Sequence, residues 1–379
     1  MRLLSEAKKG LPASWYYDPE QYSRELKAVW YRDWVCIGRV EDLPQPGDYL
    51  VASIGTQSII VTLAGDRDLK AFHNTCRHRG SVLCANERGR FRNERIICPY
   101  HTWIYSTTGE LLDTPGRIAT DDFENSNYSL YSVHVDVWRG YIFVNLADEP
   151  ATGLIEFLGA EMDYLRNWPL EDMRSVHREV MPVACNWKMF WENYNECYHC
   201  PRVHPELCKV MPIYKKAVFD DVDVPGWQPA FEGDSGMAGV GEGARTWAVN
   251  GQSSLPNIAG LTQEEIDMGV IFSSVPGSMY VVGHPDYVRT VRIIPTGPES
   301  IDLVVDWLLP NDCDAQNEAG ISAIVEFVKL VVEQDGKVCE LNQNGVHSDR
   351  HEAGVLVPQE FELWNFHEWL REKLAAADA

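Results

Sequence analysis

Two hydrophobic patterns divide the chain. Between Asp18 and Trp34, in PEQYSRELKAVWYRDW, apolar residues recur at helical spacing, which predicts an N-terminal helix. From Val35 to about Leu146 the pattern changes to short β-rich runs separated by glycine, proline, asparagine and aspartate. These runs include YLVASIG, SIIVTLA, LKAFHN, RIICP and VDVWRGYIFVNL. We therefore predict a small all-β domain in this part of the chain.

The remainder of the chain mixes helical and strand-like patterns. The turn-rich segment ADEPATGL ends the β domain. After it, helical spacing of apolar residues occurs in LIEFLGAEMDYLRNW, NWKMFWENYNECYH, a long segment at about 315–344, and FELWNFHEWLREKL. SMYVVG, VRTVRIIPT and SIDLVVDWLL are strand-like. Segment 215–262 is loop-like, and its glycines between 233 and 243 favour a lid or a surface loop. The predicted fold class is α+β, with an antiparallel sheet covered by helices in the second domain.

Composition narrows the possible partners. The chain has 379 residues, 45% of them hydrophobic, and a formal net charge of −23, which argues against binding nucleic acid or an anionic membrane surface. Apolar runs are shorter than the roughly 20 residues of a membrane span, and the N-terminus lacks the apolar core of a secretion signal. Ten cysteines without such a signal indicate a reducing cytosol, so a cytoplasmic location is expected.

Three cysteines and two histidines lie within CRHRGSVLCANERGRFRNERIICPYHTW. Cys76 and His78 form one pair, and Cys98 and His101 form a second pair. Two such loops can bind a two-iron cluster from both sides, and two thiolates with two imidazoles are the ligand set of the Rieske [2Fe–2S] type. The alternatives are a structural zinc site and metal-free core residues, although zinc fingers usually group cysteine with cysteine. Cys84 is predicted to be a buried free thiol.

A second candidate metal site lies in NWKMFWENYNECYHCPRVHP. On a regular helix Glu196 and His199 share a face. Pro201 is expected to break the helix, so that His204 turns back toward His199. Two histidines and one carboxylate form the facial triad of non-haem Fe(II) oxygenases. The alternatives are a zinc knuckle with the pattern C-x-H-C-x3-H and two core histidines beside a kink.

CRHRG followed by CPYHTW, with the downstream E-x2-H-x4-H, resembles the large (α) subunits of Rieske non-haem iron oxygenases over nearly the whole chain. Respiratory Rieske proteins carry additional cysteines in both loops, whereas this chain does not. The resemblance implies an N-terminal segment (1–34) that packs with the catalytic domain, a Rieske domain (35–150) and a START-like, helix-grip catalytic domain (151–379). The implied cluster ligands are Cys76, His78, Cys98 and His101, and the implied Fe(II) ligands are His199, His204 and Asp335.

Asp335 lies in VVEQDGKVCELNQ and is followed by Glu340 and Gln343 at the offsets typical of the family. Glu333 is the nearest alternative candidate for the third iron ligand. The resemblance also implies that Glu196 bridges an iron-ligand histidine of one subunit to a Rieske histidine of its neighbour in a head-to-tail homotrimer. The family usually has aspartate at this position. Glutamate recurs in members that act on quaternary ammonium compounds such as carnitine, glycine betaine, choline and proline betaine.

The implied reaction is reductive activation of O2, followed by hydroxylation or N-demethylation of a small molecule. The chain has no Rossmann or flavin motif, so a separate NAD(P)H-dependent flavin or iron–sulfur reductase is expected to supply the electrons. A quaternary ammonium requires aromatic faces around it. Candidate substrate residues are Trp191, Tyr194, Trp227, Trp247 and Tyr280, with core packing as the alternative for each. Aromatic-ring dioxygenation, O-demethylation and electron transfer without oxygenase activity remain alternative functions.

Overall fold

The computed structural model describes residues 3–65, 68–219, 221–224, 239–314 and 316–378. The chain divides into two compact units. One consists of residues 1–28 together with 159–379, and the other of residues 29–158. The predicted α+β class is confirmed. Among the described residues, no helix combines the length and the apolar character needed to cross a membrane.

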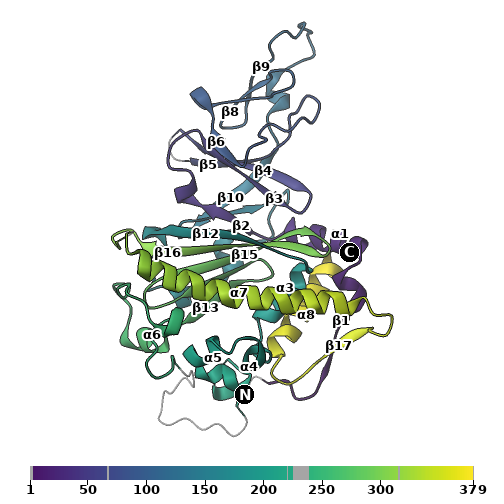
Figure 1. The fold of residues 1–379 in the computed structure, drawn as a ribbon. Coiled ribbons are helices and arrows are strands. Elements are labelled where there is room, and N and C mark those ends of the chain that lie inside the picture. Colours follow the sequence, from purple (N-terminus) through teal and green to yellow (C-terminus); the bar gives the residue numbers. More distant parts are fainter. Residues whose placement is uncertain (1–2, 66–67, 220, 225–238, 315, 379) are drawn as a thin grey trace. The chain divides into compact units, whose positions relative to one another are not determined.

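The unit of residues 29–158 consists mainly of two antiparallel sheets (Figure 1). The larger sheet has the order β2-β11-β10-β5-β4-β3-β6, and the smaller has the order β7-β8-β9. Their bounds are β2 Val35–Arg39, β3 Asp48–Ile54, β4 Gln57–Ala64, β5 Asp68–His73, β6 Arg88–Arg90, β7 Arg95–Ile97, β8 Ile104–Ser106, β9 Leu111–Asp113, β10 Ser132–Trp138 and β11 Tyr141–Asn145. A short helix, α2 (Leu154–Leu158), ends the unit.

A five-stranded antiparallel sheet forms the centre of the other unit, in the order β12-β16-β15-β14-β13. Its strands are β12 Met173–Val183, β13 Ile271–Val275, β14 Met279–Gly283, β15 Val288–Gly297 and β16 Ser300–Pro310. The long helix α7 (Glu318–Val346) runs along this sheet, as Figure 1 shows. The other elements are β1 Lys8–Pro12, paired with β17 Ala353–Leu356, and the helices α1 Pro19–Glu25, α3 Trp187–Tyr194, α4 Cys200–Val203, α5 Leu207–Val210, α6 Gln263–Met268 and α8 Phe361–Asp378.

Side-chain hydrogen bonds tie α7 to the start of α3. The Asn186 side chain caps α3 by accepting from the Lys188 backbone N–H at 3.0 Å. The Asn186 backbone N–H in turn donates to Gln343 Oε1 at 2.8 Å, and the Ala184 N–H donates to Glu340 Oε1 at 3.1 Å. Two α7 residues therefore set where α3 begins.

Three predicted helices differ from the structure. The N-terminal α-helix ends at Glu25 and continues only as a π-helical turn, Leu26–Trp30. The helix predicted from 154 stops at Leu158, because Gly159 adopts a φ of +67°, and a 3-10 turn follows. The helix α3 ends at Tyr194 rather than extending to His199.

A fully buried ion pair joins α1 to α3. Lys188 Nζ lies 2.7 Å from Glu25 Oε2, and both side chains have zero exposed area. Trp187 Nε1 donates to the same oxygen at 2.8 Å, and Gln21 Nε2 donates to Glu25 Oε1 at 3.0 Å. Burial alone lowers the pKa of Lys188, and the neighbouring Glu25 carboxylate opposes that shift. The buried Glu25 carboxylate is thus stabilised by three donors, from Lys188, Trp187 and Gln21.

We expect Lys188→Met to lower the thermal unfolding midpoint, with a loss of about 3–5 kcal/mol, because it leaves the Glu25 charge buried without its cation. The double variant Glu25→Gln with Lys188→Met is the control. Removing both charges should restore much of the lost stability. Equal midpoints for Lys188→Met and the wild type would contradict this role of the pair.

Candidate metal centres

The two Cys–His loops of the β unit have the same backbone hydrogen bonds. The Gly80 N–H donates to the Cys76 carbonyl at 2.9 Å, and the Thr102 N–H donates to the Cys98 carbonyl at 3.1 Å. Gly80 and Thr102 both have positive φ, of +73° and +57°. In addition, the Cys76 N–H donates to the Ser81 carbonyl and the Cys98 N–H donates to the Trp103 carbonyl, both at 2.9 Å. The two loops are therefore structural copies of each other.

The side chains of these loops form a donor set suited to an iron–sulfur cluster. Cys76 and Cys98 are 3% and 2% exposed, in a core with Tyr105, whose hydroxyl lies 3.3 Å from Cys76 Sγ. The rings of His78 and His101 lie at the surface side, with centroids 4.6 Å apart. Two buried sulfurs and two accessible imidazoles from facing loops fit the ligand set of a Rieske centre.

Cys84, between the loops, is a buried free cysteine, and burial raises the pKa of its thiol to about 12. Trp103 stacks on His78, with ring centroids 4.7 Å apart. The tryptophan thus covers one imidazole of the cluster site.

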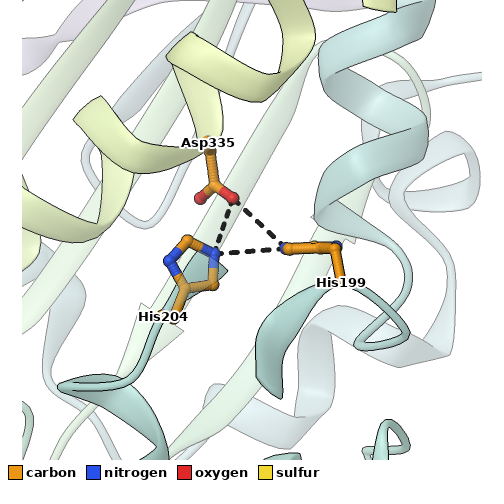
Figure 2. Close-up of side chains that lie close together, drawn as sticks. All are labelled: His199, His204 and Asp335. Atoms are coloured by element: carbon orange, nitrogen blue, oxygen red, sulfur yellow. Dashed lines mark hydrogen bonds and ion pairs between the residues drawn. The ribbon is translucent and has the colours of Figure 1, made fainter. Parts of the chain in front are cut away.

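In the other unit, two histidines and one aspartate meet (Figure 2). His199 Nε2 lies 3.2 Å from His204 Nε2, and Asp335 Oδ1 lies 3.3 Å and 2.8 Å from these two nitrogens. One potential ligand atom from each residue lies within 4.8 Å of the others. His204 and Asp335 are buried, and the side chain of His199 is 17% exposed. Two imidazoles and one carboxylate can hold a metal ion and leave coordination positions open.

Local structure brings the histidines together in a different way from the one predicted. Glu196 and His199 lie in the turn after α3, not on a helix face, and they still meet, with His199 Nδ1 2.5 Å from Glu196 Oε1. Pro201 does not break a helix. It occupies the first turn of α4, where its missing N–H costs nothing, and His204 follows as the C-cap residue of that helix.

Electrostatics in this cluster favour a cation. Burial disfavours a charged His199, but hydrogen bonds with Asp335, Cys200 and Glu196 outweigh it and raise the pKa of His199 to about 12. Burial would also raise the pKa of Asp335, yet its hydrogen bonds with both histidines hold the pKa below the usual value. A bound metal ion would take the place of the extra proton and satisfy the same carboxylate.

Polar neighbours orient two of the three side chains. Gln334 Oε1 lies 2.8 Å from His204 Nδ1 and fixes that nitrogen as the donor, which leaves Nε2 facing Asp335. Gln334 is itself held by Glu206, through a 3.1 Å hydrogen bond. Glu196 accepts from the His199 backbone N–H at 3.2 Å and from the Tyr198 N–H. The metal-facing atoms are therefore aligned by residues adjacent to them.

A pocket opens beside the cluster, with a cavity volume of about 40 Å³. Its lining includes five aromatic residues and one cation: Tyr194, Tyr214, Phe219, Trp247, Phe272 and Arg289. A cavity of this size holds a few water molecules. Side chains must therefore move to admit a larger molecule.

The predicted substrate residues separate into three groups. Tyr194 and Trp247 line the pocket. Trp191 and Tyr280 are buried and stack on each other at 4.6 Å, and neither lines the pocket. Trp227 lies outside the described residues, as do residues 233–238 of the glycine-rich segment. Sequence reasoning missed Tyr214, Phe219, Phe272 and Arg289, which come from separate loops and strands with no shared spacing.

Comparison with known families identifies the class of the protein. The family "Ring hydroxylating alpha subunit (catalytic domain)" matches residues 170–376, and "Rieske [2Fe-2S] domain" matches residues 33–124. The chain belongs to the ring hydroxylating alpha subunit family and is the terminal oxygenase component of a Rieske system, an oxidoreductase. The predicted family and both cofactors, a Rieske [2Fe–2S] cluster and a mononuclear iron, are confirmed.

The chain is similar in sequence to two groups of monooxygenases. It is 29% identical over 393 residues to the glycine betaine monooxygenase oxygenase subunit of Chromohalobacter salexigens, covering 96% of this chain and 85% of that protein. It is 26% identical over 369 residues to the chloroplastic choline monooxygenase of Spinacia oleracea, covering 96% and 78%.

Solved structures share the fold. The quaternary ammonium Rieske monooxygenase CntA in complex with L-carnitine matches with a TM-score of 0.72 at 20% identity, covering 96% of each chain. Naphthalene 1,2-dioxygenase from Rhodococcus sp. bound to indole matches with a TM-score of 0.76 at 19% identity, covering 96% of this chain and 94% of that one. These two likenesses concern the fold alone.

Proposed function

We propose that this oxygenase hydroxylates an N-methyl group of a small quaternary ammonium compound, which then loses formaldehyde. The observation that carries the proposal is an aromatic pocket directly beside the cluster of two histidines and one aspartate. The similarity to glycine betaine and choline monooxygenases supports the same substrate class. Glutamate rather than aspartate at position 196 also supports it.

We assign the metal ligands from the donor sets. Cys76, His78, Cys98 and His101 would hold the [2Fe–2S] cluster, and His199, His204 and Asp335 would hold the mononuclear Fe(II). When bound, the cluster supplies single electrons and the Fe(II) activates O2. Glu333 lies beside Asp335 on α7, but the atoms that meet the histidines are those of Asp335.

Aromatic rings suit a quaternary ammonium because their faces attract a desolvated cation by about 2 kcal/mol or more. Tyr214, Phe219, Phe272 and Trp247 contact one another in a closed sequence, with centroid distances of 6.2, 6.5, 5.9 and 6.2 Å. Because the cavity beside them holds only a few water molecules, these rings would have to move apart to surround a trimethylammonium group.

The stoichiometry of the reaction shows that the oxygenase needs an external source of electrons. One oxygen atom of O2 enters a C–H bond of the N-methyl group, and the other leaves as water with two electrons and two protons. The N-hydroxymethyl ammonium ion that results then breaks its C–N bond and releases formaldehyde, the tertiary amine and a proton. The family takes electrons from a separate reductase. We propose an NAD(P)H-dependent flavin or iron–sulfur reductase, which the acidic surface charge of the chain would suit.

We further propose a head-to-tail homotrimer in which Glu196 links His199 of one subunit to a Rieske histidine of the next. The close contact between Glu196 Oε1 and His199 Nδ1 supports the first half of that link. A cytoplasmic location is also part of the proposal, supported by ten free cysteines.

Hydroxylation of a flat aromatic substrate is the second candidate. It is favoured by the fold shared with naphthalene 1,2-dioxygenase, and aromatic side chains can stack on such a substrate as well.

We expect three irons per chain in the reconstituted wild type and two in Asp335→Asn, because the amide lacks the carboxylate charge that a metal ion requires. The visible absorption of the Rieske cluster should stay unchanged. Glu333→Gln, two residues away on the same helix, is the matched control and should keep three irons. Three irons in Asp335→Asn and two in Glu333→Gln would instead identify Glu333 as the ligand.

Glu196→Gln should keep all three irons and the cluster spectrum but slow electron transfer from the reduced cluster to the catalytic site. The amide loses the charge that polarises His199 Nδ1–H. Single-turnover re-oxidation of the cluster, followed by stopped-flow absorption with substrate and O2, measures this step. Re-oxidation at the wild-type rate would refute the bridging role.

With a reductase and NAD(P)H, the protein should release formaldehyde from an N-methylated quaternary ammonium compound and not hydroxylate benzoates or naphthalene. Formaldehyde is quantified against O2 and NAD(P)H consumption, and a one-to-one ratio to NAD(P)H indicates coupled turnover. Ring-hydroxylated products without formaldehyde would replace the proposed function with the second candidate.

A further inference from the structure

A buried arginine faces the pocket without a partner for two of its donor atoms. Arg289, on β15, is 1% exposed and lines the pocket with His199, His204 and Asp335. Among the described residues, its Nε and Nη1 have no hydrogen-bond acceptor. Its guanidinium lies over two aromatic rings, 4.9 Å from the Trp247 ring centroid and 5.7 Å from that of Tyr194, and it also interacts with the Tyr194 hydroxyl.

Three buried acids of this unit have other partners. Asp286 accepts from Thr246 at 2.7 Å and pairs with Arg245 at 3.3 Å. Asp306 pairs with Arg178 at 2.6 Å and with Arg292 at 3.6 Å. Asp335 contacts the two histidines. No ion pair between Arg289 and a carboxylate is present among the described residues, and two of its donor atoms have no acceptor there.

A buried, unpaired guanidinium is costly, since arginine keeps its charge and loses the hydration of its donors. Trp247 Nε1, in the lining of the same pocket, is a further buried donor without an acceptor among the described residues. Asn193 Oδ1 and the Tyr194 hydroxyl are also unsatisfied in the described part of this lining, but the charged group among the unsatisfied atoms is the guanidinium, which requires an acceptor. A carboxylate accepts from a guanidinium through two oxygens and neutralises its charge.

We propose that Arg289 binds a carboxylate of the substrate. The pocket then selects a zwitterion, a quaternary ammonium carboxylate of the betaine class, over a cation without an acid group such as choline. The inference rests on the proposed function in taking this pocket as the substrate site. A lone cation would meet the like charge of Arg289, whereas a betaine brings the counter-charge with it.

The test compares four ligands of similar size on the anaerobic, iron-loaded protein by isothermal titration. Glycine betaine has both charges, 3,3-dimethylbutanoate keeps only the carboxylate, choline keeps only the ammonium, and 3,3-dimethylbutanol has neither. The wild type should bind glycine betaine at least about tenfold more tightly than choline. Arg289→Met should remove that preference by weakening both carboxylates at least about tenfold, while choline binding stays equal or improves. Arg289→Lys should retain part of the preference.

Arg292→Met is the matched control, because Arg292 lies three residues further along β15, is 6% exposed and already pairs with Asp306. It should leave the betaine-to-choline ratio unchanged. Equal losses for all four ligands in Arg289→Met would mean a packing role and overturn the proposal. So would failure of both carboxylates to bind the wild type. Arginine-dependent binding of 3,3-dimethylbutanoate with no turnover of any ammonium compound would uphold this inference and refute the proposed function.

Discussion

A carboxylate buried between two imidazoles is the interaction on which the catalytic unit depends. Asp335 is 4% exposed in the middle of α7, and its oxygen lies 2.8 Å from His204 Nε2. Without a metal ion, a proton on a histidine balances the carboxylate, because the hydrogen bonds of His199 with Asp335, Cys200 and Glu196 outweigh burial and raise the pKa of His199. The cluster therefore favours a cation, and on our assignment a divalent ion bound by the two histidines and Asp335 would take the place of that proton.

The rest of the unit keeps those three side chains in place. Because Asp335 and the histidines are more than 130 positions apart, their distance depends on how α7 docks against α3. Gln343 fixes the start of α3 from one side, and the Lys188–Glu25 pair fixes it from the other. Asn195 then ends α3 by bonding to the Trp191 carbonyl at 2.6 Å and lies 2.9 Å from the Tyr280 hydroxyl. The stacked Trp191 and Tyr280 thus support the turn that carries Glu196 and His199 instead of contacting the pocket.

The structure brings Cys76, His78, Cys98 and His101 together in two short matching loops, and their role as cluster ligands stays a prediction. Sequence reasoning predicted the fold class correctly, from the change of hydrophobic period. It was less reliable where tertiary contacts decide. The i, i+3 spacing of Glu196 and His199 predicted contact on a helix, yet the contact forms in a turn after Asn195 caps α3. Most of the pocket lining could not be predicted from the sequence, because Phe219, Phe272 and Arg289 share no periodicity and come together only in the folded structure.

Arg289 also shows why the number of aromatic residues alone does not predict which ligand the pocket binds. Many aromatic residues suggest a cation cage, but here the protein's own guanidinium already lies over Trp247 and Tyr194. On our proposal, the aromatic faces of the pocket attract the ammonium group of the substrate, and Arg289 attracts its carboxylate. A molecule with a single charge would satisfy one end and leave the other desolvated and unpaired. A molecule with both charges satisfies each end, and on our proposal it is held by its carboxylate while an N-methyl group faces the two histidines and Asp335.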